Sequence, residues 1–196
     1  MPENEQKRLK TSTNEPWEDD FRLPSTVQPH HYDLYLYPDL TTQTFTGSVA
    51  INVTSSETRD VFLIHTKWLN ITNTKISQVD ESGSEIQEVE IVDLFEFEPN
   101  EFWVIRTNST EPGTYKIWMD FSGSLTTGIV GFYYSEYADS SGNSRGLATT
   151  KFEPTYARRA FPCFDEPSFK STYTIKIVRP SDGYIALSNM PVEVGS

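Results

Sequence analysis

Residues 45–53, FTGSVAINV, decide the fold, because apolar side chains and a glycine at the odd positions alternate with small or polar residues at the even ones. This period of two is typical of a β-strand with one buried face. The same alternation recurs at residues 115–121 and 173–177. Weaker strand patterns lie at residues 32–37, 60–65, 70–79, 86–97, 102–106, 130–134 and 184–188.

Clusters of turn-forming residues separate these segments, and no amphipathic helix of useful length lies between them. About ten short strands at this spacing predict an all-β fold, either a β-sandwich or an open, curved pair of sheets. One helical turn is expected at residues 155–159. We interpret Trp68, Trp103 and Trp118 as anchors of the core or of its margin.

The first 20 residues have a different composition from the rest of the chain. They are polar and lack the apolar core of a signal peptide. We therefore expect a disordered leader at residues 1–20, with Trp17 docking onto the edge of the domain. Residues 21–196 are long enough for one domain with a substantial core.

Composition excludes several classes of function. The net charge of −12 leaves no basic stripe that could neutralise the phosphates of a nucleic acid. No apolar run approaches the ~20 residues of a membrane span. The single cysteine excludes an internal disulfide.

Three glycosylation sequons begin at Asn52, Asn70 and Asn108. They favour an extracellular or luminal location. A cytoplasmic location is the alternative, because a chain rich in Asn, Ser and Thr contains some sequons by chance.

Residues 149–167, TTKFEPTYARRAFPCFDEP, carry most of the chemistry. Pro154 forces Glu153 toward an extended conformation, and a carboxylate on such a segment suits the ammonium group of a ligand. An ordinary surface glutamate beside a proline is the alternative interpretation. Asp165 and Glu166 are adjacent and point in opposite directions, so we expect them to pair with Arg158 or Arg159 or with loop amides.

The other reactive side chains do not form a recognisable catalytic motif. Cys163 lies among aromatic residues and prolines, which favours a buried, inert thiol over a nucleophile. The adjacent His30 and His31 splay to opposite faces of a strand, and no zinc-ligand spacing occurs. We expect no catalytic residue and no metal site in this chain.

Residues 147–167, LATTKFEPTYARRAFPCFDEP, resemble the segment near the active site of the aminopeptidase N-like zinc aminopeptidases, a family of gluzincin exopeptidases. The order of other segments matches as well, and the resemblance covers residues 21–193. These segments are FRLPSTVQPHHYDLYLYPDL followed by FTGSVAINV at residues 21–53, GIVGFYYSEY at residues 128–137 and ALSNMPVE at residues 186–193.

The resemblance implies a mostly antiparallel, saddle-like β-sandwich that sits on a thermolysin-like catalytic domain. The family's zinc, its general base and its transition-state tyrosine belong to that next domain, whose motifs do not occur here. We therefore expect the sequence to be incomplete at its C-terminal end. The implied partners are peptide N-termini and the catalytic domain, or a full-length homologue.

The resemblance also assigns roles to three residues. Glu153 matches the glutamate that binds the free α-amino group of the substrate. Lys151 departs from the family, which usually has glutamine at this pocket position, and a lysine there should repel basic and favour acidic or polar substrate side chains. Phe152 has two open interpretations, lining the cleft or packing against the sheet.

Two alternatives come from other classes of function. One is a stand-alone, non-catalytic binding or regulatory protein derived from this family. The other is a carbohydrate-binding or immunoglobulin-like adhesion module, which would share the strand pattern but does not explain AFPCFDEP and lacks the Cys…Trp…Cys spacing.

Overall fold

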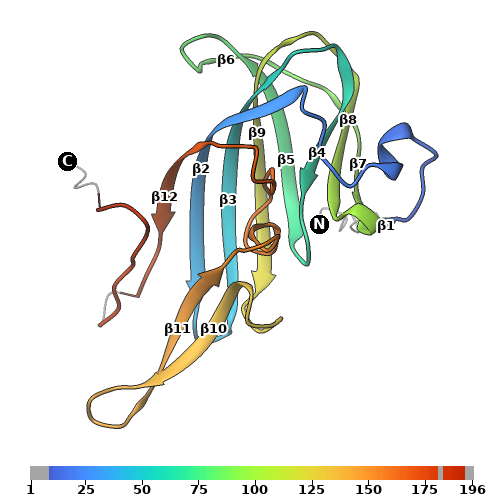
Figure 1. Cartoon of the computed structure of the whole chain (residues 1–196). Coiled ribbons are helices and arrows are strands. Elements are labelled where there is room, and N and C mark those ends of the chain that lie inside the picture. The colour runs from blue at the N-terminus through green and yellow to red at the C-terminus, as the bar shows by residue number, and fades with distance from the viewer. Residues whose placement is uncertain (1–8, 181–182, 193–196) are drawn as a thin grey trace, which may run out of the picture.

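The computed structural model describes residues 9–180 and 183–192, and these residues form three sheets (Figure 1). The all-β prediction is confirmed. The strands are β1 (Leu9–Lys10), β2 (Val27–Asp39), β3 (Thr44–Ser55), β4 (Arg59–His65), β5 (Asn70–Val79), β6 (Glu85–Glu88), β7 (Ile91–Phe97), β8 (Phe102–Thr110), β9 (Gly113–Ser124), β10 (Gly131–Ala138), β11 (Ser144–Lys151) and β12 (Thr172–Ile177), and the 3₁₀ turns are η1 (Pro16–Asp19), η2 (Glu98–Asn100) and η3 (Ala157–Arg159).

The largest sheet has six strands in the order β12-β2-β3-β9-β5-β6. Its strand β3 contains the FTGSVAINV segment, and Phe45, Val49, Ile51 and Val53 are buried as their alternation predicts. Neighbouring strands are antiparallel except β12, which runs parallel to β2. Burial alternates along β2, β5 and β9, so one face of the sheet packs on the core and the other face is open.

A four-stranded sheet of order β1-β7-β8-β4 covers the core face of the large sheet. The Phe62 and Tyr115 rings meet at 5.6 Å between the sheets, and the Trp103 indole donates a hydrogen bond to Thr74 Oγ1 at 3.1 Å. Burial of Trp103 confirms its prediction as a core anchor. Trp118 is 38% exposed and Trp68 is 51% exposed, so neither of them is a core anchor.

The segment predicted at residues 86–97 is not one strand. It divides into β6 and β7, which belong to different sheets. The amide of Val89 still bonds the carbonyl of Ile76 on β5 at 2.9 Å, and the chain then leaves the large sheet. The alternation of apolar and polar residues continues through residues 86–97, so it does not show that the chain passes from one sheet to the other.

Residues 9–20 differ from the expected disordered leader. Strand β1 pairs in parallel with β7, and Asn100 donates hydrogen bonds to the carbonyls of Glu18 and Asp20 at 2.9 and 3.0 Å. The Trp17 ring lies 5.1 Å from Phe97, which confirms its docking at the domain edge. Residues 1–8 lie outside the described residues.

The third sheet is the β10–β11 hairpin, which projects from one end of the large sheet in Figure 1. After β11 the chain runs back along the large sheet and ends the described fold with β12. The strand predicted at residues 184–188 is not found: no described strand pairs with this segment, and Ile185 and Leu187 are each 79% exposed. Within the described residues, no helix is long and apolar enough to cross a membrane.

Candidate functional site

Lys151 and Glu153 lie where the β10–β11 hairpin joins the loop that returns to the core. Lys151 is the last residue of β11 and pairs with Gly131 of β10. Both side chains are exposed, and within the described part of the chain neither makes a side-chain hydrogen bond or an ion pair. A cation and a carboxylate are thus both available to a ligand at the base of the hairpin.

Phe152, between these two residues, is half-buried. Its ring packs at 5.9 Å against that of Phe161 in an edge-to-face arrangement. Its carbonyl accepts a hydrogen bond of 2.7 Å from the amide of Tyr156, and the Glu153–Pro154 peptide within this turn is cis. The turn therefore fixes the backbone that carries Glu153. The Phe152 ring thus packs against Phe161, and a role in lining the cleft stays a prediction.

An ionic network anchors the loop after the turn. Arg158 is only 8% exposed, and its guanidinium bonds Asp165 at 2.9 Å and Glu101 at 3.0 Å. Lys67 contacts the second oxygen of Glu101. The predicted structural pairing of Asp165 with Arg158 is confirmed, and the helical turn expected at residues 155–159 is found as η3.

Glu166 also has the structural role that its sequence context predicts. Its carboxylate accepts a hydrogen bond of 2.6 Å from the amide of Leu23 and pairs with Arg22 at 3.1 Å. The carboxylates of Asp165 and Glu166 are therefore occupied by different partners. They do not form an acid–base pair for catalysis.

Cys163 and His65 form a bridge between the loop and β4. Their backbones exchange two hydrogen bonds, of 2.9 and 3.1 Å, and His65 Nδ1 accepts a third, of 3.2 Å, from the amide of Asp165. Burial, with a smaller effect of the Arg158 charge, lowers the pKa of His65 to about 3. Burial raises the pKa of the Cys163 thiol well above its ordinary value, so the inert interpretation of this cysteine agrees with its surroundings.

Several residues that position the site were not found from the sequence. The Tyr32 hydroxyl accepts a hydrogen bond of 3.0 Å from the amide of Phe164, across a separation of 132 residues. The Arg159 guanidinium stacks on Trp68 at 4.1 Å and on Tyr156 at 4.6 Å. From the sequence, the aromatic side chains of Trp68 and Tyr156 indicate that a cation could stack on them, but they do not indicate that the cation is Arg159.

The side chains present do not suit a zinc ion. His30 bonds Thr54 at 2.8 Å, His31 bonds Thr172 at 2.7 Å, and His65 is buried against Asp165. Among the described residues no three His, Cys, Asp or Glu side chains converge as a metal site would require.

The three sequon asparagines lie on strands. Asn70 and Asn108 are exposed, and Asn52 is half-buried on the open face of the large sheet. The Asn108 amide donates a hydrogen bond of 2.9 Å to Glu90. The exposure of Asn70 and Asn108 is compatible with a bulky surface modification.

Comparison with known proteins identifies the family. A sequence model of the Peptidase M1 N-terminal domain matches residues 28–195. Aminopeptidase A of Gloydius brevicauda is 42% identical over 186 residues, which cover 94% of this chain and 19% of the relative. Glutamyl aminopeptidase of Homo sapiens is 41% identical over 182 residues, 88% of this chain and 18% of the relative.

Endoplasmic reticulum aminopeptidase 2 of Homo sapiens is 42% identical over 178 residues, 90% of this chain and 18% of the relative. The chain thus spans about a fifth of the length of the curated relatives it matches. A match over nearly the whole chain, with relatives above 40% identity, shows that the chain belongs to the Peptidase M1 N-terminal domain family.

Proposed function

We propose that this chain is the substrate-recognition domain of a zinc-dependent aminopeptidase, with Glu153 binding the free α-amino group of a peptide. The observation that carries this proposal is the Glu153 carboxylate, exposed and unpaired within the described residues, on a turn whose base is fixed in the core. An exopeptidase must favour a terminal ammonium, and a fixed carboxylate does so through a charge-assisted hydrogen bond.

The proposal assigns no bond cleavage to the chain alone. Among the residues that the structure describes, no group of histidine, cysteine and carboxylate side chains converges on a metal. The zinc and the groups that activate water would be supplied by a catalytic domain, the proposed partner of this domain. The resident zinc polarises the scissile carbonyl and its bound water in enzymes of this kind. The role of this chain is to hold the substrate's N-terminus.

Lys151 extends the proposal to the side chain of the first substrate residue. Its exposed ammonium, which has no ion-pair partner among the described residues, lies two residues from Glu153 and would attract an acidic side chain and repel a basic one. The name glutamyl aminopeptidase, given to relatives about 40% identical to this chain, agrees with a preference for acidic N-termini. Phe152, held against Phe161, would support the two charged residues from below.

A chimeric enzyme tests both assignments. Residues 28–195 would replace the matching segment of human glutamyl aminopeptidase, and kcat/KM would be measured for substrates with a free or an acetylated N-terminus. Glu153→Gln should lower kcat/KM for free N-termini by about 10- to 150-fold, the range expected for one hydrogen bond to a charged group. It should leave the slow turnover of acetylated substrates unchanged, because these lack the ammonium.

In the same chimera, Lys151→Gln should reduce the preference for N-terminal glutamate over arginine by roughly tenfold, since one favourable charge contact is lost. Glu88→Gln and Lys170→Gln, at other exposed positions, are the matched controls. Equal losses for free and acetylated substrates would contradict the role of Glu153. An unchanged glutamate-to-arginine ratio would contradict that of Lys151.

We further propose that Asn52, Asn70 and Asn108 carry N-linked glycans and that the domain lies on the luminal or extracellular side of a membrane. Exposure of Asn70 and Asn108 supports this assignment. Secretory expression of the chain, followed by peptide-N-glycosidase and mass spectrometry, should convert the modified asparagines to aspartate. Unmodified Asn70 and Asn108 in secreted material would rule the proposal out.

A further inference from the structure

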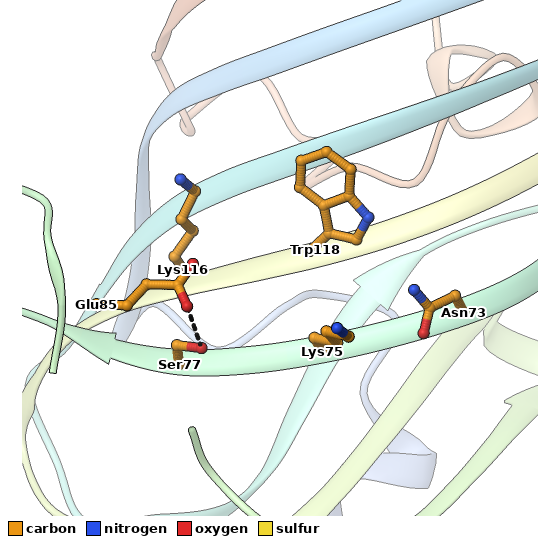
Figure 2. A pocket seen from close by; sticks show the side chains of 6 residues that line it. All are labelled: Asn73, Lys75, Ser77, Glu85, Lys116 and Trp118. Atoms are coloured by element: carbon orange, nitrogen blue, oxygen red, sulfur yellow. Dashed lines mark hydrogen bonds between the residues drawn. The ribbon is translucent and has the colours of Figure 1, made fainter. Parts of the chain in front are cut away.

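The open face of the six-stranded sheet contains a polar depression, far in sequence from the Glu153 turn. Figure 2 shows its lining side chains, which project from β5, β9 and the start of β6. The depression has a volume of about 260 Å³, which is below the usual range for drug-sized ligands and suits a single small ring. The residues that line it are Asn73, Lys75, Ser77, Glu85, Lys116 and Trp118.

Trp118 provides a fixed aromatic surface in this depression. Its indole N–H donates a hydrogen bond of 3.1 Å to one oxygen of Asp120, and Asn73 donates one of 3.0 Å to the other oxygen. The ring is thus held by its polar edge while 38% of the residue stays exposed. The side-chain carbonyl of Asn73 remains available as an acceptor. An indole on the solvent side of a sheet contributes nothing to the buried core, but it can stack on a ligand.

Two lysines line the depression. Lys75 pairs directly opposite Trp118, and Lys116 lies two residues before Trp118 on β9. In the part of the chain that the structure describes, neither lysine forms an ion pair, whereas Lys10 and Lys67 both do. The one carboxylate in the lining, Glu85, accepts a hydrogen bond of 3.3 Å from Ser77. The Asp120 carboxylate lies beside the depression as well, but its two oxygens accept the hydrogen bonds of Trp118 and Asn73, which leaves the two ammonium groups for a ligand.

We propose that this depression binds an acidic monosaccharide, such as a uronic acid. The flat C–H face of the pyranose ring would stack on Trp118, and the sugar carboxylate would lie between Lys75 and Lys116. A ring hydroxyl would donate to the Asn73 carbonyl. A purely aromatic ligand would leave both ammonium groups and the amide unpaired, and a bare anion would not use the indole. This site is independent of the peptide-recognition role of Glu153, because its residues lie on other strands.

The experiment is an NMR titration of the ¹⁵N-labelled 196-residue chain with glucuronate, glucose and acetate. The probe signal is the indole N–H of Trp118, assigned with the Trp118→Phe variant. Glucuronate should shift this signal saturably with a dissociation constant on the order of 1 mM, as expected for a small ligand in an open site. Glucose and acetate, each with half of the required chemistry, should bind at least about fivefold more weakly.

Variants complete the test. Lys75→Gln and Lys116→Gln should each weaken glucuronate binding at least about fivefold, and Lys170→Gln should leave it unchanged. All three side chains are polar and partly or fully exposed, so these changes preserve the fold, which circular dichroism verifies. The proposal is overturned if glucuronate causes no saturable shift at 20 mM, if acetate shifts the signal as strongly, or if Lys170→Gln weakens binding as much as the two site variants.

Discussion

At the scale of single residues, His65 shows how burial turns an ordinary side chain into a determinant of stability. It is 1% exposed, and its Nδ1 accepts the amide hydrogen of Asp165. This bond requires an imidazole without a proton on Nδ1. The nearby Arg158 guanidinium also opposes a second positive charge. The folded protein therefore holds His65 neutral well below neutral pH.

The low pKa of His65 in the folded protein predicts that the protein loses stability in acid. The folded pKa of His65 is about 3, whereas a histidine in the unfolded chain has a pKa near 6.5. Between these values only the unfolded chain binds the proton, so the free energy of unfolding should fall as the pH falls, by about 1.4 kcal/mol per pH unit. The contribution is fully present above about pH 6.5. Urea denaturation at pH 7, 6 and 5 measures it.

His65→Asn keeps an acceptor for the Asp165 amide but cannot titrate. It should therefore flatten the dependence of stability on pH between 7 and 5, even if it lowers stability overall. His30→Asn, at an exposed position, should retain the slope of the parent chain. A variant His65→Asn with the same slope as the parent would show that other groups cause the acid sensitivity.

Residue-level prediction succeeded where partners are close in sequence. Arg158 and Asp165 are seven residues apart in one loop, so their pairing could be inferred from the loop itself. Glu101, the second partner of Arg158, is 57 residues away and lies after a turn that no sequence pattern connects to the loop. The role of Glu153 came from family resemblance, because an exposed glutamate before a proline has no distinctive chemistry of its own.

At the scale of elements, β3 and β9 fit together through two glycine–phenylalanine contacts. Gly47 lies under the ring of Phe121, and Gly123 lies under the ring of Phe45. The register pairs each glycine directly with the phenylalanine of the other strand. Each aromatic ring thus covers the backbone where its cross-strand partner has no side chain.

Gly47→Ala should therefore destabilise the protein by roughly 1–3 kcal/mol, the usual cost of overpacking a core. An added Cβ would lie 2.6 Å from the Phe121 ring and 2.6 Å from the Tyr35 carbonyl oxygen, and that backbone atom cannot move aside. Thermal denaturation measures the change. Gly113→Ala, whose Cβ would come no nearer than 3.3 Å to the end of a flexible glutamine, is the control and should change stability by much less.

Element prediction was accurate for strands with one buried face and wrong where layers change. The alternation in β3 and β9 identified strands because pleating sends successive side chains to opposite faces. The same alternation located β12, although neither of its faces is buried. The alternation does not indicate which sheet a strand joins. Residues 86–97 were consequently predicted as one strand although they belong to two sheets. Residues 184–188 alternate but pair with no strand in the described part of the chain.

At the scale of the whole molecule, residues 9–20 pack against the four-stranded sheet. Trp17 contacts the rings of Phe95, Phe97 and Phe102, and the Lys10 ammonium lies 3.7 Å from the centre of the Phe95 ring. Polar composition suggested disorder here. The Trp17 ring, the β1–β7 pairing and the Asn100 hydrogen bonds together hold the segment against the four-stranded sheet.

Trp17→Ala should lower the free energy of unfolding by about 2 kcal/mol, because it removes a partly buried aromatic side chain from this cluster. Hydrogen exchange of the β1 amides should also accelerate, since β1 would lose its anchor. Phe21→Ala, at a residue 75% exposed, should alter neither quantity. Equal effects of the two variants would mean that the Trp17 contacts do not stabilise the sheet.

The parallel pairing of β12 with β2 governs the order of events when the chain is synthesised. His31 and Thr172 are neighbours in this pair, yet 141 residues separate them. A parallel partner cannot be added through a tight turn, and here the strands β3 to β11 are all synthesised before β12. As the chain leaves the ribosome, strands β2, β3, β9 and β5 can associate early while the outer edge of β2 stays unpaired. During this interval β2 exposes hydrogen-bonding groups to any other extended chain, and the emergence of β12 ends that exposure.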